Sequence, residues 1–278
     1  MITNGDKKMK SFGHILRQAL LVILCGIFLG IFIFAAHELY YTLHGYHAAE
    51  KAYESLSQQY VSTQTAAEVT PEPTPKETEK VEETAPPVVS GDINVDFAAL
   101  QAVNPQVVGW IYSPNTVISY PVLKGADNDY YLSHLYDGTV SANGSIFMDC
   151  VCESDLNQDN TILYGHHMNN GSMFASINNY IYEGYLEEHP VLYYYTPDGN
   201  YALQVFACFV TGGDSDVYAF NFATRDQFQS FIDRMRSRSN FDAPDVSVTS
   251  SDRIMTLSTC AYDYDDARYV VLCKIVPM

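Results

Sequence analysis

The hydrophobic pattern of this chain begins with one long apolar run near the N-terminus. Residues 19–36 are apolar or glycine without interruption, and a helix of that length rises about 27 Å, close to the hydrocarbon thickness of a bilayer. Four basic residues precede the run: Lys7, Lys8, Lys10 and Arg17. The pattern predicts a single transmembrane anchor over 19–36, with residues 1–18 in the cytoplasm and the rest outside. A cleaved signal peptide is the alternative, although the run is long for one.

Two polar segments of different composition follow the apolar run. Residues 37–61 are polar but compatible with a helix, and they predict a short helical stalk. Residues 62–93 are dominated by Thr, Pro and Glu and contain few residues that could form a core. That composition predicts an extended, disordered linker. A globular domain is then expected over residues 94–278.

From residue 94 onward, short apolar runs alternate with turn residues, which is typical of a β-rich domain. A short helix is expected first, over residues 96–102, because Asn104 and Pro105 then end it. Strand-like runs follow at 107–114, 117–124, 144–149, 160–167, 189–196, 201–212, 253–260 and 267–277. Short strands at this spacing predict a mainly β fold, a closed or nearly closed barrel.

One segment of this domain has the period of a helix instead of a strand. Its apolar residues fall on one helical face: Phe228, Phe231, Ile232 and Met235. Thr224 is suited to cap the helix, and Gln227 three residues later completes a capping box. The pattern predicts one helix inserted in the barrel, over about residues 225–239.

Composition and charge exclude some classes of function. Tyr and Phe are abundant, at 22 and 14 residues, while charged residues make up only 17% of the chain. This favours a compact, sheet-rich domain over a coiled coil. The formal net charge of −18 argues against a nucleic-acid partner, because affinity for phosphate requires clustered Lys and Arg.

The chain has six cysteines, one of them inside the apolar run. Cys208 and Cys273 lie in apolar strand-like runs and are expected to be small buried side chains. Cys150 and Cys152 are too close for an ordinary bridge to each other, and a lone C-x-C is a poor metal site. A bridge from one of them to another cysteine is a minor alternative. Cys260 is left as the cysteine with chemically useful neighbours.

The candidate chemistry lies where strand-like runs begin or end, at Cys260, His166 and Arg268. A thiolate can attack a carbonyl carbon, an imidazole can carry the proton, and a guanidinium can stabilise the oxyanion. Taken singly, they have ordinary explanations as a buried cysteine, a loop histidine and a surface ion pair. His167 is a competing imidazole, which strand alternation directs to the side opposite His166. Together these residue types predict cysteine-based acyl transfer.

The segments around these residues resemble the sortase family, and in particular its class B. The resemblance rests on 256–260 (TLSTC), on 164–168 (YGHHM) and on Arg268 eight residues after the cysteine. Flanking blocks extend it over about residues 100–278: 108–111, 120–122, 127–132, 144–147 and 171–174. The resemblance implies a closed eight-stranded β-barrel with an N-terminal helix and the inserted helix at about 225–239.

The resemblance also implies roles for single residues. It selects His166 over His167 as the catalytic histidine, makes Cys260 the carrier of a thioacyl intermediate, and gives Arg268 the stabilisation of that step. Asp263, Asp265 and Asp266 follow the cysteine, and the sequence does not decide whether one of them orients the site. The positions implied to line the substrate groove are Asn128, Leu132, Tyr164 and Ser258.

The implied function is that of a membrane-anchored cysteine transpeptidase on the outer face of a Gram-positive bacterium. Its expected partners are surface proteins with a C-terminal sorting motif, cleaved after Thr, and an amine of a peptidoglycan precursor or of the wall. Neither a cofactor nor a metal is expected. Specificity is expected in the loops around residues 128–132 and 180–189. An extracytoplasmic cysteine hydrolase and a non-enzymatic surface-binding module are the alternatives.

Overall fold

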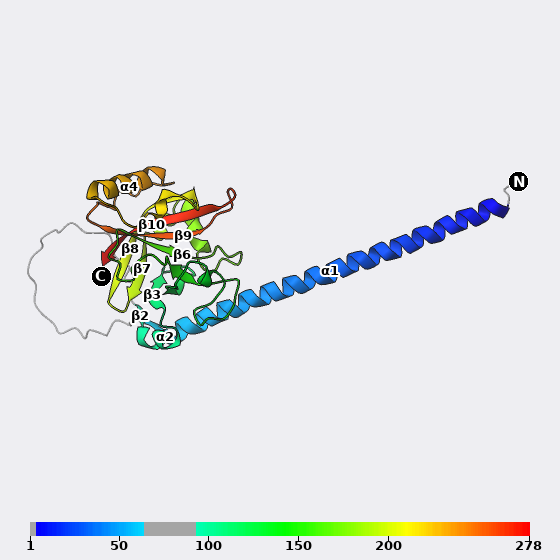
Figure 1. The fold of residues 1–278 in the computed structure, drawn as a ribbon, viewed down its shortest axis with the longest axis horizontal. Helices are drawn as coiled ribbons and strands as arrows, with labels where there is room; N and C mark the ends of the chain where they lie inside the picture. Colours follow the sequence, from blue (N-terminus) through cyan, green and yellow to red (C-terminus); the bar gives the residue numbers. More distant parts are fainter. Residues whose placement is uncertain (1–3, 64–92) are drawn as a thin grey trace, which may run out of the picture. The chain divides into compact units, whose positions relative to one another are not determined.

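The computed structural model describes residues 4–63 and 93–278, which form two compact units, Met1–Ala48 and Ala49–Met278 (Figure 1). Helix α1 (Asn4–Tyr60) makes up the described part of the first unit and ends in the second. Within the described residues it is the one helix long and apolar enough to cross a bilayer. The expected anchor at 19–36 and nearly all of the expected stalk at 37–61 therefore belong to one continuous helix.

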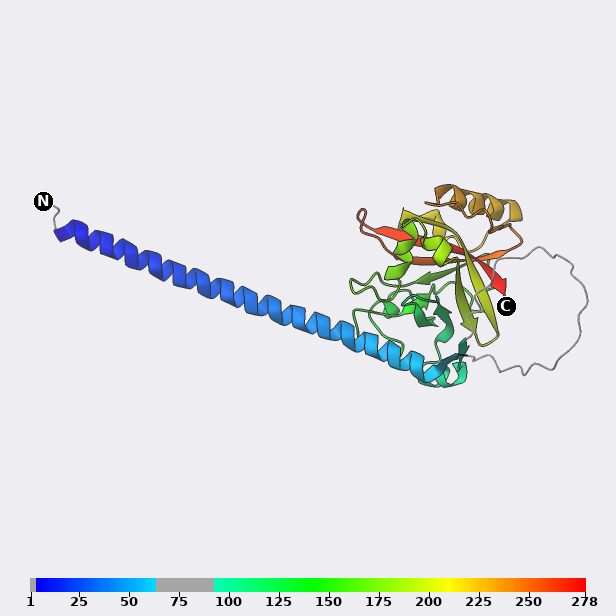
Figure 2. The same cartoon turned by 180° about the vertical axis from the view of Figure 1, so that it is seen from behind.

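The second unit is built on a closed barrel of eight strands, so the predicted fold class is confirmed (Figures 1 and 2). The order around the barrel is β10-β8-β7-β3-β4-β5-β6-β9. The strands are β3 (Val107–Tyr112), β4 (Ser119–Leu123), β5 (Ile146–Met148), β6 (Asn160–Tyr164), β7 (Val191–Thr196), β8 (Gly199–Gly212), β9 (Arg253–Cys260) and β10 (Ala267–Pro277). The pairs β4–β5 and β6–β9 are parallel, and the other neighbours are antiparallel.

Strands β6 and β9 are buried along almost their whole length, and their polar side chains are buried together with the apolar ones. In β9, every side chain from Ile254 to Thr259 is buried. Closure of the barrel removes the free strand edges that could otherwise pair with another chain.

Helix α4 (Arg225–Arg238) is the predicted inserted helix, and it covers β8 and β10 from outside (Figure 1). Thr224 caps it as predicted, because its side chain accepts a hydrogen bond from the Gln227 N–H at 3.2 Å. The four apolar residues of its inner face are buried against the barrel: Phe228, Phe231, Ile232 and Met235. The hydrophobic period therefore predicted both the helix and the face that it buries.

The N-terminal layer of the second unit includes the last turns of α1. Ala49, Tyr53 and Leu56 are almost completely buried, and the Tyr53 hydroxyl donates to the Gly144 carbonyl at 2.8 Å. Beyond α1, β1 (Val61–Thr63) pairs with β2 (Ile93–Val95), and α2 (Phe97–Val103) is the short N-terminal helix that was predicted. The compact unit thus begins at Ala49, upstream of the expected boundary at 94, because three apolar side chains of α1 complete its core.

The expected linker at 62–93 lies mostly outside the described residues, which resume at residue 93. Its two described ends lie side by side, since Thr63 is the pairing partner of Ile93. Both described ends of the segment therefore lie in the second unit.

Several short helices lie in segments where the sequence pattern predicts no helix. They are η1 (Tyr130–Leu132), η2 (Ala175–Ile181), α3 (Tyr185–Glu188) and η3 (Asp216–Tyr218). Single turns of this kind depend on tertiary contacts, because a nucleus of one turn is unfavourable by itself. All six cysteines are free, so the minor alternative of a disulfide bridge is wrong for this structure.

Candidate active site

The parallel pairing of β6 and β9 brings the histidine and the cysteine to one end of the barrel. Tyr164 lies opposite Ser258 in this register. His166 and Cys260 each follow two residues later, His166 just past the end of β6 and Cys260 at the end of β9. Residues two apart along a strand share a face. The two side chains therefore emerge at the same level of two neighbouring strands, although they are far apart in the chain.

Arg268 reaches the cysteine from the other neighbour of β9. In the antiparallel pairing of β9 with β10, Arg268 is the direct partner of Cys260. Such partners project from the same face, with their Cβ atoms about 4.5–5.5 Å apart. The guanidinium forms an ion pair of 2.7 Å with Asp266 and is 31% exposed. Of the acidic residues after the cysteine, Asp266 thus binds the arginine and not a histidine.

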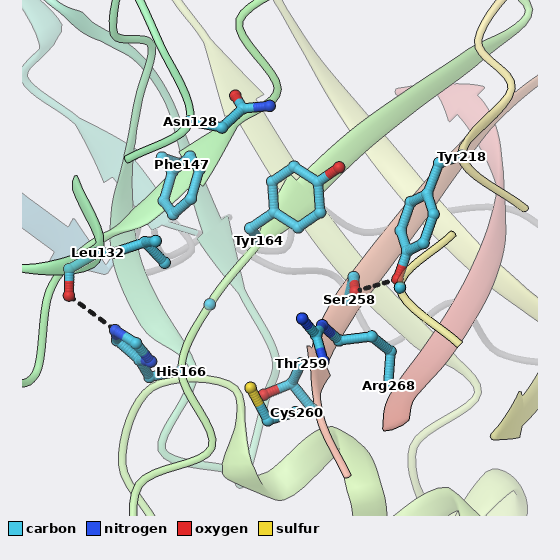
Figure 3. Close-up of a pocket in the computed structure, with 12 residues that line it drawn as sticks. Asn128, Leu132, Phe147, Tyr164, His166, Tyr218, Ser258, Thr259, Cys260 and Arg268 are labelled. Atoms are coloured by element: carbon cyan, nitrogen blue, oxygen red, sulfur yellow. Dashed lines mark hydrogen bonds between the residues drawn. The ribbon is translucent and has the colours of Figure 1, made fainter. Parts of the chain in front are cut away.

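A cavity of about 350 Å³ contains all the residues that were expected to form the site (Figure 3). The seven predicted residues that line it are Asn128, Leu132, Tyr164, His166, Ser258, Cys260 and Arg268. Five further residues line it without having been predicted: Phe147, Gly165, Gly213, Tyr218 and Thr259. The structure therefore brings the candidate catalytic and substrate-binding residues together in a single groove.

Gly165 is required by packing directly before the candidate histidine. A Cβ atom at this position would lie 2.7 Å from the Phe174 ring and would also collide with the side chain of Ile146. Both contacts are with buried core residues that cannot move freely. The glycine lets the chain pass close to the barrel core as it turns from β6 toward His166. A glycine at this position in the sequence therefore indicates that the backbone passes close to another part of the protein.

The two adjacent histidines face different surroundings. His166 Nε2 donates to the Leu132 carbonyl at 2.7 Å, so its ring is turned toward that carbonyl in Figure 3. Among the described residues no hydrogen bond joins His166 to Cys260. His167 lies on the other side, where its Nδ1 is 3.0 Å from the Cys260 carbonyl oxygen. His166 is therefore the histidine that shares the cavity with the thiol.

Tyr218 is the main residue of the site that sequence reasoning missed. Its hydroxyl is hydrogen-bonded to the Ser258 hydroxyl at 2.9 Å, and its ring lies 6.0 Å from that of Tyr164. Burial raises the pKa of Tyr218 above its ordinary value, so the phenol stays protonated. It projects from η3, in a loop with no recognisable local motif. Only the tertiary fold brings it over the groove.

A second cavity, of about 670 Å³, lies beside His167. Tyr185 and His189, from the loop at 180–189 that was expected to set specificity, line this cavity and not the one with Cys260. The loop at 128–132 contributes Asn128 and Leu132 to the cysteine cavity. Across the residues that the structure describes, no cluster of three or more His, Cys, Asp or Glu side chains is arranged to hold a metal ion.

A thiol, an imidazole and a guanidinium in one groove of a closed β-barrel define a cysteine-dependent acyl-transfer site. Comparisons with known proteins identify the particular family. The sortase domain model matches residues 111–276. Sortase B of Listeria monocytogenes is 36% identical over 190 residues, which cover 68% of this chain and 77% of the relative.

Solved structures agree with these sequence matches. The Staphylococcus aureus sortase B–substrate complex has a TM-score of 0.62 at 36% identity, covering 66% of this chain and 85% of that one. A sortase B complexed with triglycine has a TM-score of 0.62 at 37% identity, covering 66% and 86%. The chain therefore belongs to the sortase family of cysteine transpeptidases, and its relatives are of class B.

Proposed function

We propose that this protein cleaves a C-terminal sorting signal after threonine and transfers the shortened protein to an amine through a thioacyl intermediate on Cys260. The observation that carries the proposal is the convergence of His166, Cys260 and Arg268 on one groove from three strand ends. The same groove offers apolar and polar walls for an extended peptide, including Leu132 and Tyr164. A thiol, an imidazole and a guanidinium are the groups that attack on a carbonyl carbon requires.

In the first half of the reaction, the Cys260 thiol passes its proton to His166, and the resulting thiolate attacks the threonine carbonyl carbon and forms a bond to it. Negative charge develops on the carbonyl oxygen, and the guanidinium of Arg268 stabilises it. His166 then gives a proton to the leaving amine as the peptide bond breaks. His166 Nε2 carries a proton in this structure, because it donates to the Leu132 carbonyl. A turn of the ring away from Leu132 would deliver that proton to the leaving group.

In the second half, an incoming amine attacks the thioester carbon. The amine loses a proton to the histidine, a new amide bond forms, and Cys260 leaves as the thiolate. The complexes of similar proteins with a substrate and with triglycine support an amine nucleophile of the glycine-peptide type for this chain as well. We infer that its partners are surface proteins with a sorting motif and an amine of the peptidoglycan precursor or wall.

The proposed location follows from the sequence pattern around α1. Residues 19–36 would cross the membrane, with residues 1–18 in the cytoplasm and the catalytic unit outside the cell. Residues 37–61 would serve as the helical stalk, residues 62–93 as an extended segment, and residues 94–278 as the catalytic core, to which the end of α1 adds Tyr53. The exposed apolar side chains of α1 support this arrangement.

The test uses the full chain in detergent micelles and a panel of fluorogenic peptides with different sorting motifs. Each peptide is incubated with and without triglycine, beside Cys260→Ala, and the products are identified by mass. Cleavage after threonine with formation of a triglycine adduct, lost in the variant, is the expected result. Free acid as the sole product would favour the hydrolase, and cleavage by Cys260→Ala would overturn the proposal.

A further inference from the structure

A buried carboxylate lies directly behind the wall of the cysteine cavity. Asp149 follows the last residue of β5, and its backbone N–H donates to the Ile162 carbonyl at 2.9 Å, which extends the β5–β6 pairing by one step. Asp149 is only 7% exposed and does not line the cavity. A carboxylate buried to this degree is costly unless donors surround it. Its donors therefore indicate what it does.

Three donors converge on the Asp149 carboxylate. The Val151 N–H donates to Oδ1 at 3.0 Å. Asn128 Nδ2 donates to Oδ2 at 3.1 Å, and the Tyr164 hydroxyl donates to the same oxygen at 2.9 Å. Asn128 and Tyr164 both line the cysteine cavity. One oxygen of Asp149 thus joins two separate parts of the groove wall, the loop before η1 and the end of β6.

These contacts determine how Asn128 is oriented. Its Oδ1 accepts from the Cys150 backbone N–H at 2.8 Å, while its Nδ2 donates to Asp149. A backbone N–H can only donate and a carboxylate can only accept, so the flipped amide would lose both bonds. The side-chain amide is therefore held in one orientation. One N–H and one oxygen lone pair of Asn128 are unused by hydrogen bonds among the described residues.

The same carboxylate determines the role of the Tyr164 hydroxyl. Because its proton is directed to Asp149, the phenol oxygen can only accept from any further partner. Burial, and then the nearby charge of Asp149, raises the pKa of Tyr164 above its ordinary value. The phenol therefore remains protonated over the whole working range of pH. The groove wall offers a defined set of partners, a donor and an acceptor on Asn128 and an acceptor on Tyr164.

We propose that Asp149 is a positioning residue for the sorting peptide, holding Asn128 and Tyr164 so that they bind an amide group of the substrate. This inference rests on the proposed function. A peptide amide has one N–H and one carbonyl oxygen, which matches the unused donor and acceptors of the wall. Asp149 does not touch the peptide, and it acts on peptide affinity through the two side chains that do.

The kinetic test is Asp149→Asn in the full chain in detergent, with a sorting peptide that the wild type turns over. Asparagine has the same shape as aspartate, but its side-chain NH₂ group would face the N–H and O–H groups that donate to Asp149. We expect kcat/KM to fall by about tenfold, mostly through KM, as for the loss of a hydrogen bond to a charged group. Alkylation of the Cys260 thiol by a small neutral reagent should keep its rate, because the thiol is not part of this network.

A double-variant background separates positioning from general destabilisation. In a chain that already carries Asn128→Ala and Tyr164→Phe, Asp149→Asn should change kcat/KM by less than about twofold, since its partners are gone. Asp159→Asn is the matched control, because Asp159 is a buried carboxylate that pairs with Arg225 outside the cavity. It should leave KM unchanged. An equal effect of Asp149→Asn in both backgrounds, or one confined to kcat, would overturn the inference.

A second measurement does not depend on any substrate. Thermal unfolding of the full chain is compared for Asp149→Asn, Asn128→Ala and the double variant. If the carboxylate holds the amide, Asn128→Ala lowers Tm clearly less in the Asp149→Asn background than in the wild type. Additive shifts in Tm would overturn the inference. If the wild type cleaved none of the peptides, the proposed function would be contradicted. The comparison of Tm values would still decide whether Asp149 holds Asn128.

Discussion

Arg268 lies directly opposite Cys260 in the antiparallel pairing of β9 and β10. This relationship is fixed by the register of two neighbouring barrel strands, because a slip of one residue would turn the arginine to the other face of the sheet. Ser258 pairs in turn with Val270 and with Tyr164 of β6. The spacing of the site is thus a consequence of barrel pairing and does not depend on a flexible loop.

Cys260→Ala should abolish peptide transfer, reducing turnover by roughly 10⁴-fold or more, because no other nucleophile in the cavity can form a thioester. Its Tm should stay close to that of the wild type, since Cys260 is only half-buried at the end of β9. Cys150→Ala is the control, because Cys150 is also half-buried but does not line the cavity. Mass spectrometry of the products checks both. Turnover by the Cys260 variant would contradict the assignment.

Arg268→Lys should lower kcat by about 10²–10³-fold, as for the loss of a donor that stabilises an oxyanion. A lysine keeps the charge, but its ammonium lacks the planar fork of donors. Steady-state kinetics with a saturating sorting peptide measure the effect. Arg238→Lys serves as the control, because Arg238, at the end of α4, forms a comparable exposed ion pair with Asp216. Similar losses in both variants would show that the guanidinium donors of Arg268 have no special role.

His166→Ala should reduce both cleavage and transfer by about 10²–10⁴-fold, because the leaving amine would have no proton donor. His167→Ala should reduce them by less than about tenfold, since His167 contacts the backbone carbonyl of Cys260 and not its sulfur. The two variants differ by one position and are compared in the same assay. A larger loss in His167→Ala would reverse the assignment of the catalytic histidine.

Tyr53→Phe should destabilise the catalytic unit by about 1–3 kcal/mol, because the Gly144 carbonyl and the Ser145 hydroxyl lose their partner. Tyr53→Ala should cost about 3–5 kcal/mol, since a buried aromatic ring is also removed. Urea unfolding of the full chain in detergent measures both. The exposed Gln58→Ala, on the same helix, should be neutral. A neutral Tyr53→Ala would mean that the end of α1 is not part of the core.

The pair Asp252–Lys274 should make stability depend on acid pH. Burial alone would raise the pKa of Asp252, but the Thr249 N–H at 2.8 Å and the Lys274 ammonium at 3.1 Å lower it below its ordinary value. A carboxyl with a depressed pKa in the folded state stabilises above its ordinary pKa, and the contribution disappears as the pH falls through the folded value.

Asp252→Asn should therefore be less stable than the wild type near neutral pH, by about 1 kcal/mol or less for a pair near the surface. The two free energies of unfolding should converge as the pH falls below the ordinary aspartate value of 3.8 and through the lower pKa of Asp252 in the folded state. Urea unfolding at several pH values gives the comparison. A constant difference down to the lowest pH would show that Asp252 acts through its shape and not its charge.

Local patterns predicted much of this molecule because their physical causes are local. The helix at 225–238 followed from a cap at Thr224 and an apolar face of period 3.6, and both are present as predicted. The strands followed from short apolar runs between turn residues. The candidate residues followed from the chemistry of Cys, His and Arg at strand ends, together with the resemblance to a known family.

Other features could not be predicted because they depend on which strands become neighbours. The sequence by itself determined the apolar run, the strands, the inserted helix and the residue types of the site, since side-chain period, capping and chemistry are properties of short segments. Only the tertiary structure decided that β6 lies beside β9, that Tyr53 completes the core, and that Asp149 joins Asn128 to Tyr164. Each of these contacts joins residues distant in the chain, and only the folded unit brings them together.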